Sequence, residues 1–297
     1  MFGIAGGAGR ASILALLLVL CAAARATGAL VLRDDLQRTV VVPRNPERVI
    51  SLLPSLTEIV CALGACGRLV AAGQFDDWPA RLNKLPKAGG LDDVNVEMIV
   101  SLHPDLVLLS RAQRVTQRLD QLGIVSFALQ TDRYSDIARA VRLIGALLGV
   151  PARAAALNAR IQRAVDAVSA TAIARRRGAG PSAYFEVDRA PYAAGPQSYI
   201  GELLTRLGVR NIVAADLGPF PKLNPEYVVR RDPDVIFIAA ADVSTLADRP
   251  GWDRIRAVRE HRLCAFTPPV MNMISRPGPR VSEGMRAMAD CLARVAP

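Results

Sequence analysis

Residues 152–177 read ARAAALNARIQRAVDAVSATAIARRR and contain neither glycine nor proline. Apolar side chains recur at helical spacing within this stretch, at Leu157, Ile161, Val165 and Val168. The pattern predicts one unbroken helix, about 39 Å long at a rise of about 1.5 Å per residue. The Gly178-Ala-Gly-Pro181 segment that follows ends it. A helix of this length exceeds one that covers a single sheet, so we interpret it as a rod that joins two halves of the chain.

Both sides of this rod alternate between strand-like and helix-like segments. Before it, apolar runs at 48–53, 69–73, 106–109 and 125–129 alternate with helical patterns at 55–63, 96–102, 114–122 and 134–148. After it, runs at 183–187, 235–238 and 263–266 alternate with helical patterns at 200–207, 252–258 and 281–295. Such alternation implies parallel sheets covered by helices. The predicted fold class is α/β, with an N-terminal lobe (27–151), one long rigid connecting helix (152–177) and a similar C-terminal lobe (178–297).

Two local signals stand near the start of the first lobe. The β-type runs at 30–33 and 38–42 predict a small hairpin. Further on, Ser55-Leu-Thr-Glu58 has the spacing of a capping box, in which a serine hydroxyl and a glutamate carboxylate accept hydrogen bonds from free amides at a helix start. We therefore interpret Ser55 and Glu58 as caps of a helix that ends at Gly64.

A short internal repeat supports two lobes that are built alike. Glu97 and Glu226 each lie two residues after an asparagine and seven residues before a Pro-Asp pair. A glutamate in the first turn of a helix interacts favourably with the helix dipole, by about 0.3–1 kcal/mol, which explains each residue alone. It does not explain the matched pair. The other interpretation is that one carboxylate at the tip of each lobe meets arginines of a partner protein.

The N-terminus has the pattern of an export signal. A single arginine precedes an apolar run at 11–24, which is shorter than the roughly 20 residues of a membrane span and suits the central region of a secretory signal. We expect residues 1–26 to be a signal peptide that is cleaved near Ala26, which places the mature protein in the periplasm. Lipid anchoring at Cys21 is a weaker interpretation, because Leu20 stands where a small residue is preferred, and an uncleaved anchor is a third.

The charge and the cysteine content indicate which kinds of partner the protein binds and which cellular compartment it occupies. The 37 Lys and Arg residues against 27 Asp and Glu give a formal net charge of +10. Because the basic residues are spread along the chain, we interpret them as solvated surface and expect no nucleic-acid partner. Export permits disulfides. Four cysteines survive the expected cleavage: Cys61, Cys66, Cys264 and Cys291. The sequence leaves all three of their possible pairings open. A bridge between the first two requires a helix to end between them.

Nothing in the sequence forms a catalytic set. The chain has two histidines, His103 and His261. It has no G-x-S-x-G nucleophile elbow and no G-x-G-x-x-G after a predicted strand. We interpret His103, just before Pro104, as a solvated helix end. The expectation is a protein that is not an enzyme, with no catalytic residues, no cofactor and no bound metal.

Several loops carry residues of the kind that bind ligands. Two lobes built alike bind a ligand best in the cleft between them. Aromatic side chains on loops between lobes suit a large, flat ligand, and arginines suit a carboxylate or phosphate. The Gln74-Phe-Asp-Asp-Trp-Pro79 loop follows a predicted strand, and the other candidates lie in segments rich in proline or glycine. These residues are Phe75, Trp78, Tyr192, Phe220, Asn272, Arg276 and Arg280.

At this point the motifs resemble those of a known family. Arg48-Val-Ile-Ser-Leu-Leu-Pro-Ser-Leu-Thr-Glu58, followed by Leu63-Gly64, Pro86-Lys-Ala-Gly89 and the unit from Glu97 to Pro104-Asp105, is similar to the periplasmic substrate-binding proteins of ABC importers. The subgroup is the one with a helical backbone, which takes cobalamin, haem and ferric siderophores. The likeness runs from about Leu30 to the C-terminus. It implies a cleft between two α/β lobes with limited hinge closure, and it implies that Glu97 and Glu226 dock onto arginines of the permease dimer in the inner membrane.

Within the family, the chain looks most similar to cobalamin-binding members. Phe75 and Trp78 match aromatic loop positions there, and Phe220 falls where a cobalamin binder has a tryptophan between prolines. Arg276 matches a basic residue on the ligand side. In two departures, Leu91 replaces a typical tryptophan and Asn272 replaces an aspartate. Together with the loop residues above, the resemblance leads us to expect a ligand-binding set of Phe75, Asp77, Trp78, Leu91, Tyr192, Phe220, Asn272 and Arg276.

The expected function is that of a monomeric, exported solute-binding protein that captures a corrinoid and delivers it to an ABC importer. A ferric siderophore is an alternative ligand, and an anionic one would rely on Arg276 and Arg280. Haem is another, with Tyr192 as the best candidate for an axial ligand and His103 as a poor one. A distant alternative is an exported hydrolase, which needs a histidine, a carboxylate and a nucleophile together in the cleft.

Overall fold

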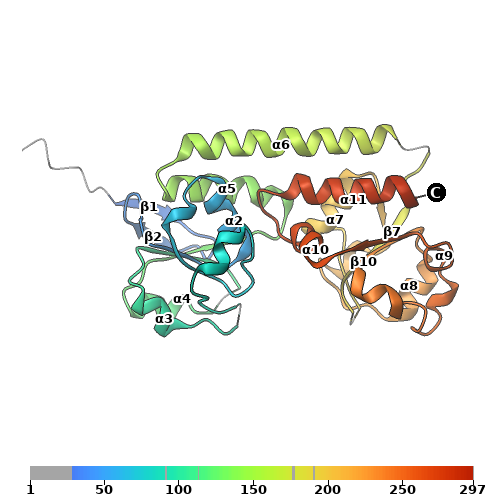
Figure 1. Cartoon of the computed structure of the whole chain (residues 1–297), viewed down its shortest axis with the longest axis horizontal. Helices are drawn as coiled ribbons and strands as arrows, with labels where there is room; N and C mark the ends of the chain where they lie inside the picture. Colours follow the sequence, from blue (N-terminus) through green and yellow to red (C-terminus); the bar gives the residue numbers. More distant parts are fainter. Residues whose placement is uncertain (1–28, 91, 113, 176–177, 190, 297) are drawn as a thin grey trace, which may run out of the picture.

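Two lobes lie side by side beneath one long helix, α6 (Pro151–Ala174), in the computed structural model (Figure 1). The structure describes residues 29–90, 92–112, 114–175, 178–189 and 191–296, so the predicted signal peptide lies outside the described residues. The predicted α/β class, with two lobes, parallel sheets and one connecting helix, is confirmed. Among the described helices, none has the length and apolarity needed to cross a membrane.

The N-terminal lobe is a four-stranded parallel sheet with helices on both faces, preceded by the predicted hairpin. The strands have the order β4-β3-β5-β6, and every neighbouring pair is parallel. The hairpin is β1 (Leu30–Arg33) with β2 (Thr39–Val42). The other elements are β3 (Val49–Ser51), α2 (Pro54–Ala62), η1 (Cys66–Arg68), β4 (Leu69–Ala72), η2 (Ala80–Lys84), α3 (Val96–Ser101), β5 (Leu106–Ser110), α4 (Thr116–Gln121), β6 (Ser126–Leu129) and α5 (Tyr134–Leu147).

The C-terminal lobe repeats this plan. Its strands have the order β11-β10-β7-β8, with β9 beside β7, and the central pairs are parallel while β7 and β8 are antiparallel. The elements are β7 (Ser182–Asp188), β8 (Tyr192–Ala193), α7 (Tyr199–Arg206), β9 (Arg210–Asn211), η3 (Ala215–Leu217), α8 (Pro225–Arg231), β10 (Val235–Ala239), η4 (Ala240–Thr245), η5 (Trp252–Arg254), α9 (Arg256–Arg259), β11 (Leu263–Phe266), α10 (Pro268–Ser275) and α11 (Val281–Val295).

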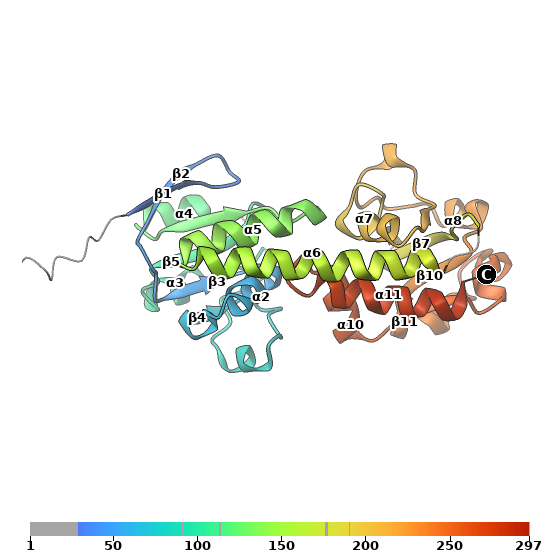
Figure 2. The same cartoon turned by 90° about the horizontal axis from the view of Figure 1, so that it is seen from above.

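Helix α6 is unbroken over 24 residues and joins the lobes through a shared apolar layer. The apolar stripe predicted from its sequence is buried. Helix α5 of the first lobe and α11 of the second lie under successive halves of α6 (Figures 1 and 2). One hydrophobic cluster runs from α2 through α5 and α6 to α11 and β7. Because interiors are close-packed and resist deformation, this layer limits how far one lobe can turn against the other.

Two disulfides resolve the pairing that the sequence left open. Cys61 pairs with Cys66, and Cys264 pairs with Cys291. The condition for the first bridge is met, because α2 ends at Ala62 and Gly64 adopts a left-handed conformation with φ 78°. The second bridge ties strand β11 to helix α11 across 27 residues of chain.

The capping-box interpretation of Ser55 and Glu58 is wrong. Helix α2 begins one residue earlier, at Pro54, and its N-cap Leu53 makes no side-chain cap. Proline suits the first helical position because its ring fixes φ and it has no N–H to leave unpaired. Ser55 and Glu58 are instead buried within the helix. Helix α10 was not predicted either, because Pro268 and Pro269 favoured a loop there.

Candidate ligand-binding cleft

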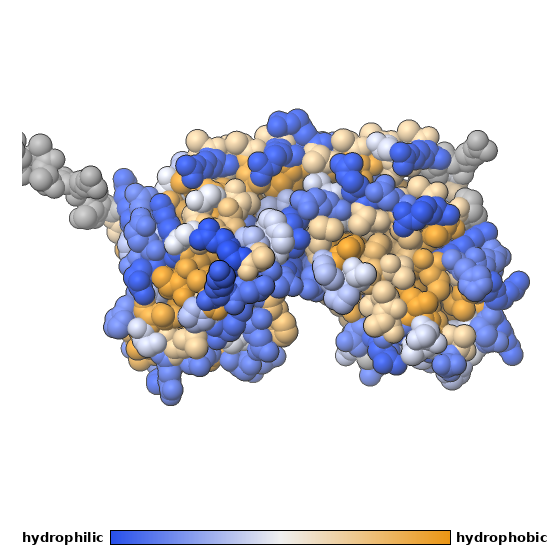
Figure 3. Space-filling model, in the orientation of Figure 1, coloured by the Kyte–Doolittle hydropathy of each residue, from blue (hydrophilic) through white to orange (hydrophobic). Residues whose placement is uncertain are grey.

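A cavity of about 300 Å³ lies between the two lobes. Leu53, Ser110 and Thr131 line it where β3, β5 and β6 end, and Val187 lines it at the end of β7. Ligands of open parallel sheets bind at this carboxyl end of the strands. Figure 3 shows the molecule hollowed between the lobes, on the side away from α6. The other lining residues are Pro54, Ser55, Ala112, Asp132, Tyr199, Ile200, Phe220, Ser275, Arg276 and Pro277.

Two of the predicted ligand residues line this cavity. Phe220 is 45% exposed and stands between two prolines on the wall of the C-terminal lobe, and Arg276 stands on the floor between the lobes. Tyr192, 40% exposed, lies on β8, and the next residue donates a backbone hydrogen bond to Pro221 (3.0 Å) beside Phe220. Tyr192 is therefore a neighbour of the cavity wall. Leu91 lies outside the described residues.

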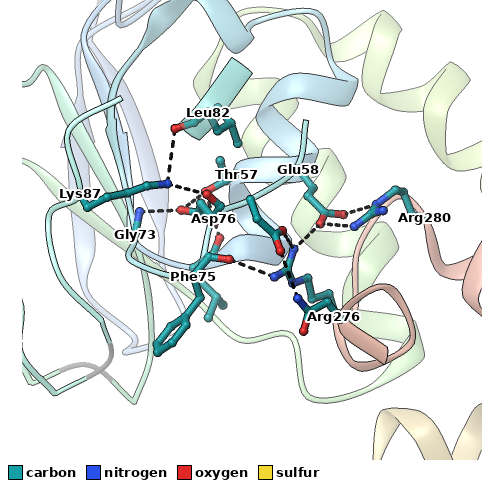
Figure 4. Close-up of polar contacts among 12 residues, drawn as sticks. Thr57, Glu58, Gly73, Phe75, Asp76, Leu82, Lys87, Arg276 and Arg280 are labelled. Atoms are coloured by element: carbon teal, nitrogen blue, oxygen red, sulfur yellow. Dashed lines mark hydrogen bonds and ion pairs between the residues drawn. The ribbon is translucent and has the colours of Figure 1, made fainter. Parts of the chain in front are cut away.

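The aromatic loop, residues 74–79, projects Phe75 and Trp78 from the N-terminal lobe, with 61% and 39% of their surface exposed. Asp76 anchors it from inside, as Figure 4 shows: its Oδ2 accepts hydrogen bonds from the Gly73 amide (2.5 Å) and the Thr57 hydroxyl (3.1 Å). Lys87 Nζ donates to the Asp76 backbone carbonyl at 2.5 Å. These contacts hold the backbone of the loop while the Phe75 ring stays mostly open to solvent and the Trp78 ring partly so.

The Asp76 carboxyl is an unusual buried acid. Its residue is 2% exposed, and its Oδ1 has no hydrogen-bond partner among the described residues. Burial raises the pKa of this carboxyl from 3.8 to about 6, against the lowering effect of its hydrogen bonds from Gly73 and Thr57 and of the nearby charges of Lys87 and Arg276.

A cluster of ion pairs joins the lobes beside the cavity; we call it the bridge and define it as Glu58, Asp77, Asn272, Arg276 and Arg280. Arg280 donates to both oxygens of Glu58, from Nε at 3.0 Å and from Nη2 at 2.8 Å. Arg276 Nη1 adds a third hydrogen bond to Glu58 at 3.2 Å (Figure 4). Glu58 comes from α2 of the first lobe, and both arginines come from the segment between α10 and α11 of the second. The Glu58 side chain is 2% exposed and those of the arginines are 11% and 12% exposed.

The bridge also holds the aromatic loop. Arg276 donates to the Asp77 carboxylate at 2.5 Å and to the Phe75 carbonyl at 2.9 Å, and Asn272 Nδ2 donates to Asp77 at 3.1 Å. The Arg280 guanidinium lies over the Trp78 ring, 4.3 Å from its centre, in a cation–π contact. The structure thus brings together predicted ligand residues far apart in sequence. Their contacts here are with one another.

The pKa values of the bridge follow from these contacts. Partial burial disfavours the charged form of Asp77, but the hydrogen bond and charge of Arg276 outweigh it and lower the pKa of the carboxyl. Burial likewise disfavours the charged form of Arg276. The hydrogen bonds and charges of Asp77 and Glu58 outweigh this effect and raise the pKa of the guanidinium. Both groups are therefore charged across the physiological range.

Glu58 was missed as an inter-lobe residue because its local sequence has a simpler explanation. The structure shows what the local pattern does not: Glu58 belongs to a run, Ser55 to Val60, in which every residue is buried. A buried carboxylate requires a cation, but nothing local identifies which of the chain's 37 basic residues supplies it.

Helices α3 and α8 carry the matched glutamates. Each begins with an asparagine cap: Asn95 Oδ1 accepts from the Met98 amide at 2.9 Å, and Asn224 Oδ1 accepts from the Glu226 amide at 3.0 Å. Figure 1 places both helices at the ends of their lobes that face away from α6. Glu97 and Glu226 are both exposed, and the Glu226 carboxylate lies 3.5 Å from Arg230 one turn along α8. The repeat therefore gives each lobe an exposed glutamate on a helix that lies on the side of the molecule opposite α6.

The two histidines lie apart from the cleft. His103 and His261 are exposed and have positive φ angles of 44° and 54°, and neither lines the cavity. The catalytic set of the hydrolase alternative therefore has no histidine at this site.

Comparison with known proteins gives consistent results. Residues 49–269 match the model of the periplasmic binding protein family. The chain is 28% identical to the uncharacterised ABC transporter substrate-binding lipoprotein YvrC of Bacillus subtilis, over 87% of this chain and 84% of that protein. It is 31% identical to a cobalamin-binding protein of Halobacterium salinarum, over 86% of this chain and 72% of that protein. Among solved structures, the periplasmic heme-binding protein RhuT of Roseiflexus sp. RS-1 in its apo form superposes with a TM-score of 0.74, at 25% identity, over 84% of this chain and 99% of that chain.

The match spans most of both lobes and the helix between them, and the fold has the two sheets, the connecting helix and the inter-lobe cavity described above. The chain therefore belongs to the periplasmic binding protein family.

Proposed function

We propose that the protein is an exported solute-binding protein that captures a corrinoid between its lobes and delivers it to an ABC importer. The observation that carries the choice of ligand is the charge balance of the cleft. Asp132 and Arg276 are the charged residues among the described ones that line the cavity. Arg276 is already paired with Asp77 and Glu58, and Arg280 is paired with Glu58.

This balance favours a ligand without net negative charge. The two arginines are paired with the carboxylates of Glu58 and Asp77, and Asp132 adds a further negative charge to the cavity lining, so these groups leave no positive charge over for an anion. Burying a charge without a partner is costly. Cyanocobalamin is neutral overall and its periphery is rich in amides, whereas haem and many siderophores carry carboxylates.

The aromatic residues support a large, flat ligand. Phe75 and Trp78 stand exposed on one lobe, and Tyr192 and Phe220 stand exposed on the other. The cavity between the lobes has a volume of about 300 Å³. This volume lies at the lower end of the range for ligand sites, roughly 300–1,000 Å³. A corrinoid seated there would extend over the exposed rings, which supply apolar contact area at low conformational cost. The likeness to a cobalamin-binding protein of Halobacterium salinarum supports the same ligand.

A second ligand is favoured by one observation. Tyr192 is exposed beside the cavity wall, and a phenol oxygen is a suitable axial ligand for haem iron. The likeness to a heme-binding protein of Roseiflexus agrees with it. Among the described residues that line the cavity, however, the cation is Arg276, and it is already paired, so it is not free to pair with haem propionates. A ferric siderophore with carboxylates has the same difficulty.

Delivery is proposed to use the two exposed glutamates. Glu97 and Glu226 are exposed on α3 and α8, one helix per lobe, and both helices lie on the side of the molecule away from α6, where arginines of a permease dimer would meet them. The likeness to an ABC transporter substrate-binding lipoprotein supports such a partner and a location outside the cytoplasm. The disulfides also agree with an oxidising compartment.

Calorimetric titration of the mature protein with cyanocobalamin, haemin and ferric hydroxamates tests the proposal. We expect cyanocobalamin to bind most tightly. If haemin or a ferric hydroxamate binds and cyanocobalamin does not, the corrinoid assignment is wrong.

A further inference from the structure

Glu58 stands behind the cavity rather than in it. It does not belong to the cavity lining, and its side chain is 2% exposed. Its two carboxylate oxygens accept the hydrogen bonds of Arg276 and Arg280 described above. Any effect of Glu58 on a ligand must therefore pass through these arginines.

Arg276 is the connection between Glu58 and the ligand space. It lines the cavity, and its Nη1 donates both to Glu58 Oε1 at 3.2 Å and to Asp77 Oδ1 at 2.5 Å. The bridge holds two positive charges, on Arg276 and Arg280, and two negative charges, on Glu58 and Asp77. Neutralising Glu58 alone leaves the bridge with a charge of +1 at the cavity wall.

We propose that Glu58 is a specificity-determining residue that acts by position: it neutralises Arg276 and Arg280 from behind the cavity and so makes the cleft reject anionic ligands in favour of neutral ones. The proposal rests on the proposed function only in taking a corrinoid as the neutral ligand. The electric field of Glu58 at the cavity is strong because its carboxylate is shielded from water. Charges in such a protein environment interact at an effective dielectric constant of about 20, against about 80 in water.

The test compares two ligands of one shape. Cyanocobalamin and its monocarboxylic acid derivative differ by one carboxylate in place of an amide. We expect the wild-type protein to bind the acid more weakly than the amide. In Glu58→Gln the ratio of the two dissociation constants, acid over amide, should fall by about tenfold or more. The conservative variant keeps a side chain of the same length and removes only the negative charge.

Two further variants keep the test decisive. Glu283→Gln makes the same charge change at an exposed position on α11 and should leave the ratio unchanged. Asp77→Asn removes the other carboxylate of the bridge, whose side chain is 51% exposed. It should also lower the ratio of the two dissociation constants. This variant therefore tests the charge effect even if Glu58→Gln does not fold. Circular dichroism of each variant confirms that it is folded.

The outcomes separate this inference from the proposed function. If the wild-type protein binds neither corrinoid, the proposed function fails, and the charge effect is then measured with haemin, whose affinity should rise about tenfold or more in Glu58→Gln. If folded Glu58→Gln and Asp77→Asn both keep the wild-type preference between ligands, the role of Glu58 in specificity is wrong.

Discussion

Removing the Glu58 carboxylate should destabilise the whole protein. Glu58 accepts three hydrogen bonds of 2.8–3.2 Å from two guanidinium groups that are themselves almost buried. Removing one partner of a buried ion pair costs about 3–5 kcal/mol, because the other charge is left without compensation. In Glu58→Ala, Arg276 keeps Asp77, and the contact that Arg280 keeps within the described part of the chain is the one with the Trp78 ring. We therefore expect the free energy of unfolding to fall by about 3 kcal/mol, the lower end of that range.

Equilibrium unfolding in urea at pH 7 measures this loss. The matched control is Glu226→Ala, which breaks an ion pair with Arg230 whose side chains are 75% and 67% exposed. Exposed pairs contribute about 0–1 kcal/mol, so this variant should unfold close to wild type. A double-mutant cycle with Arg280→Met isolates the direct coupling, which should exceed about 1 kcal/mol. If Glu58→Ala is no less stable than Glu226→Ala, the bridge does not hold the lobes together as argued.

Three further measurements test other parts of the molecule. Because burial raises the pKa of Asp76 to about 6, the folded protein holds a proton that the unfolded chain has lost, and stability should rise as the pH falls from about 6 to about 4. Asp76→Asn should remove up to about 3 kcal/mol of this gain in the free energy of unfolding, measured with urea between pH 6 and pH 4. If the variant keeps the wild-type dependence of stability on pH, the prediction is wrong. Glu97→Arg with Glu226→Arg should abolish stimulation of the importer's ATPase while ligand affinity stays the same, and lost affinity would make them site residues instead. Cys264→Ser with Cys291→Ser opens a crosslink across 27 residues and should cost about 3–4 kcal/mol in urea unfolding, whereas a loss below about 1 kcal/mol would refute the estimate.

The architecture was predictable because it depends on periodic patterns. The stripe from Leu157 to Val168 fixes one face of α6, and the structure buries it. The last helix, Val281–Val295, has the bounds that its pattern predicted. Breakers such as Gly64 act locally, so their effect can be judged without knowing the fold.

The inter-lobe contacts were not predictable in the same way. Glu58 and Arg280 are 222 residues apart, and their hydrogen bonds exist only because both lobes are in place. The local pattern around Ser55 and Glu58 favoured a cap, and Pro54 made a cap unnecessary. Arg276 was predicted to be a ligand residue from its residue type, its place in a proline-rich segment and the resemblance, but its pairing with Asp77 depends on tertiary structure. The sequence therefore indicated candidate residues for the site but not how they contact one another.

The bridge and the apolar layer under α6 constrain the motion by which a ligand could enter or leave. They join the lobes at different depths: the layer lies against α6, and the bridge lies beside the cavity. A rotation of one lobe about α6 that widens the cavity has to separate Glu58 from Arg276 and Arg280, which costs several kcal/mol because all three are nearly buried. Ligand capture therefore has to proceed mainly by rearrangement of exposed rings such as Phe75 and Phe220 rather than by wide opening. Release by lobe separation needs an outside source of free energy, and we expect the proposed contacts of the permease with α3 and α8, one helix on each lobe, to supply it.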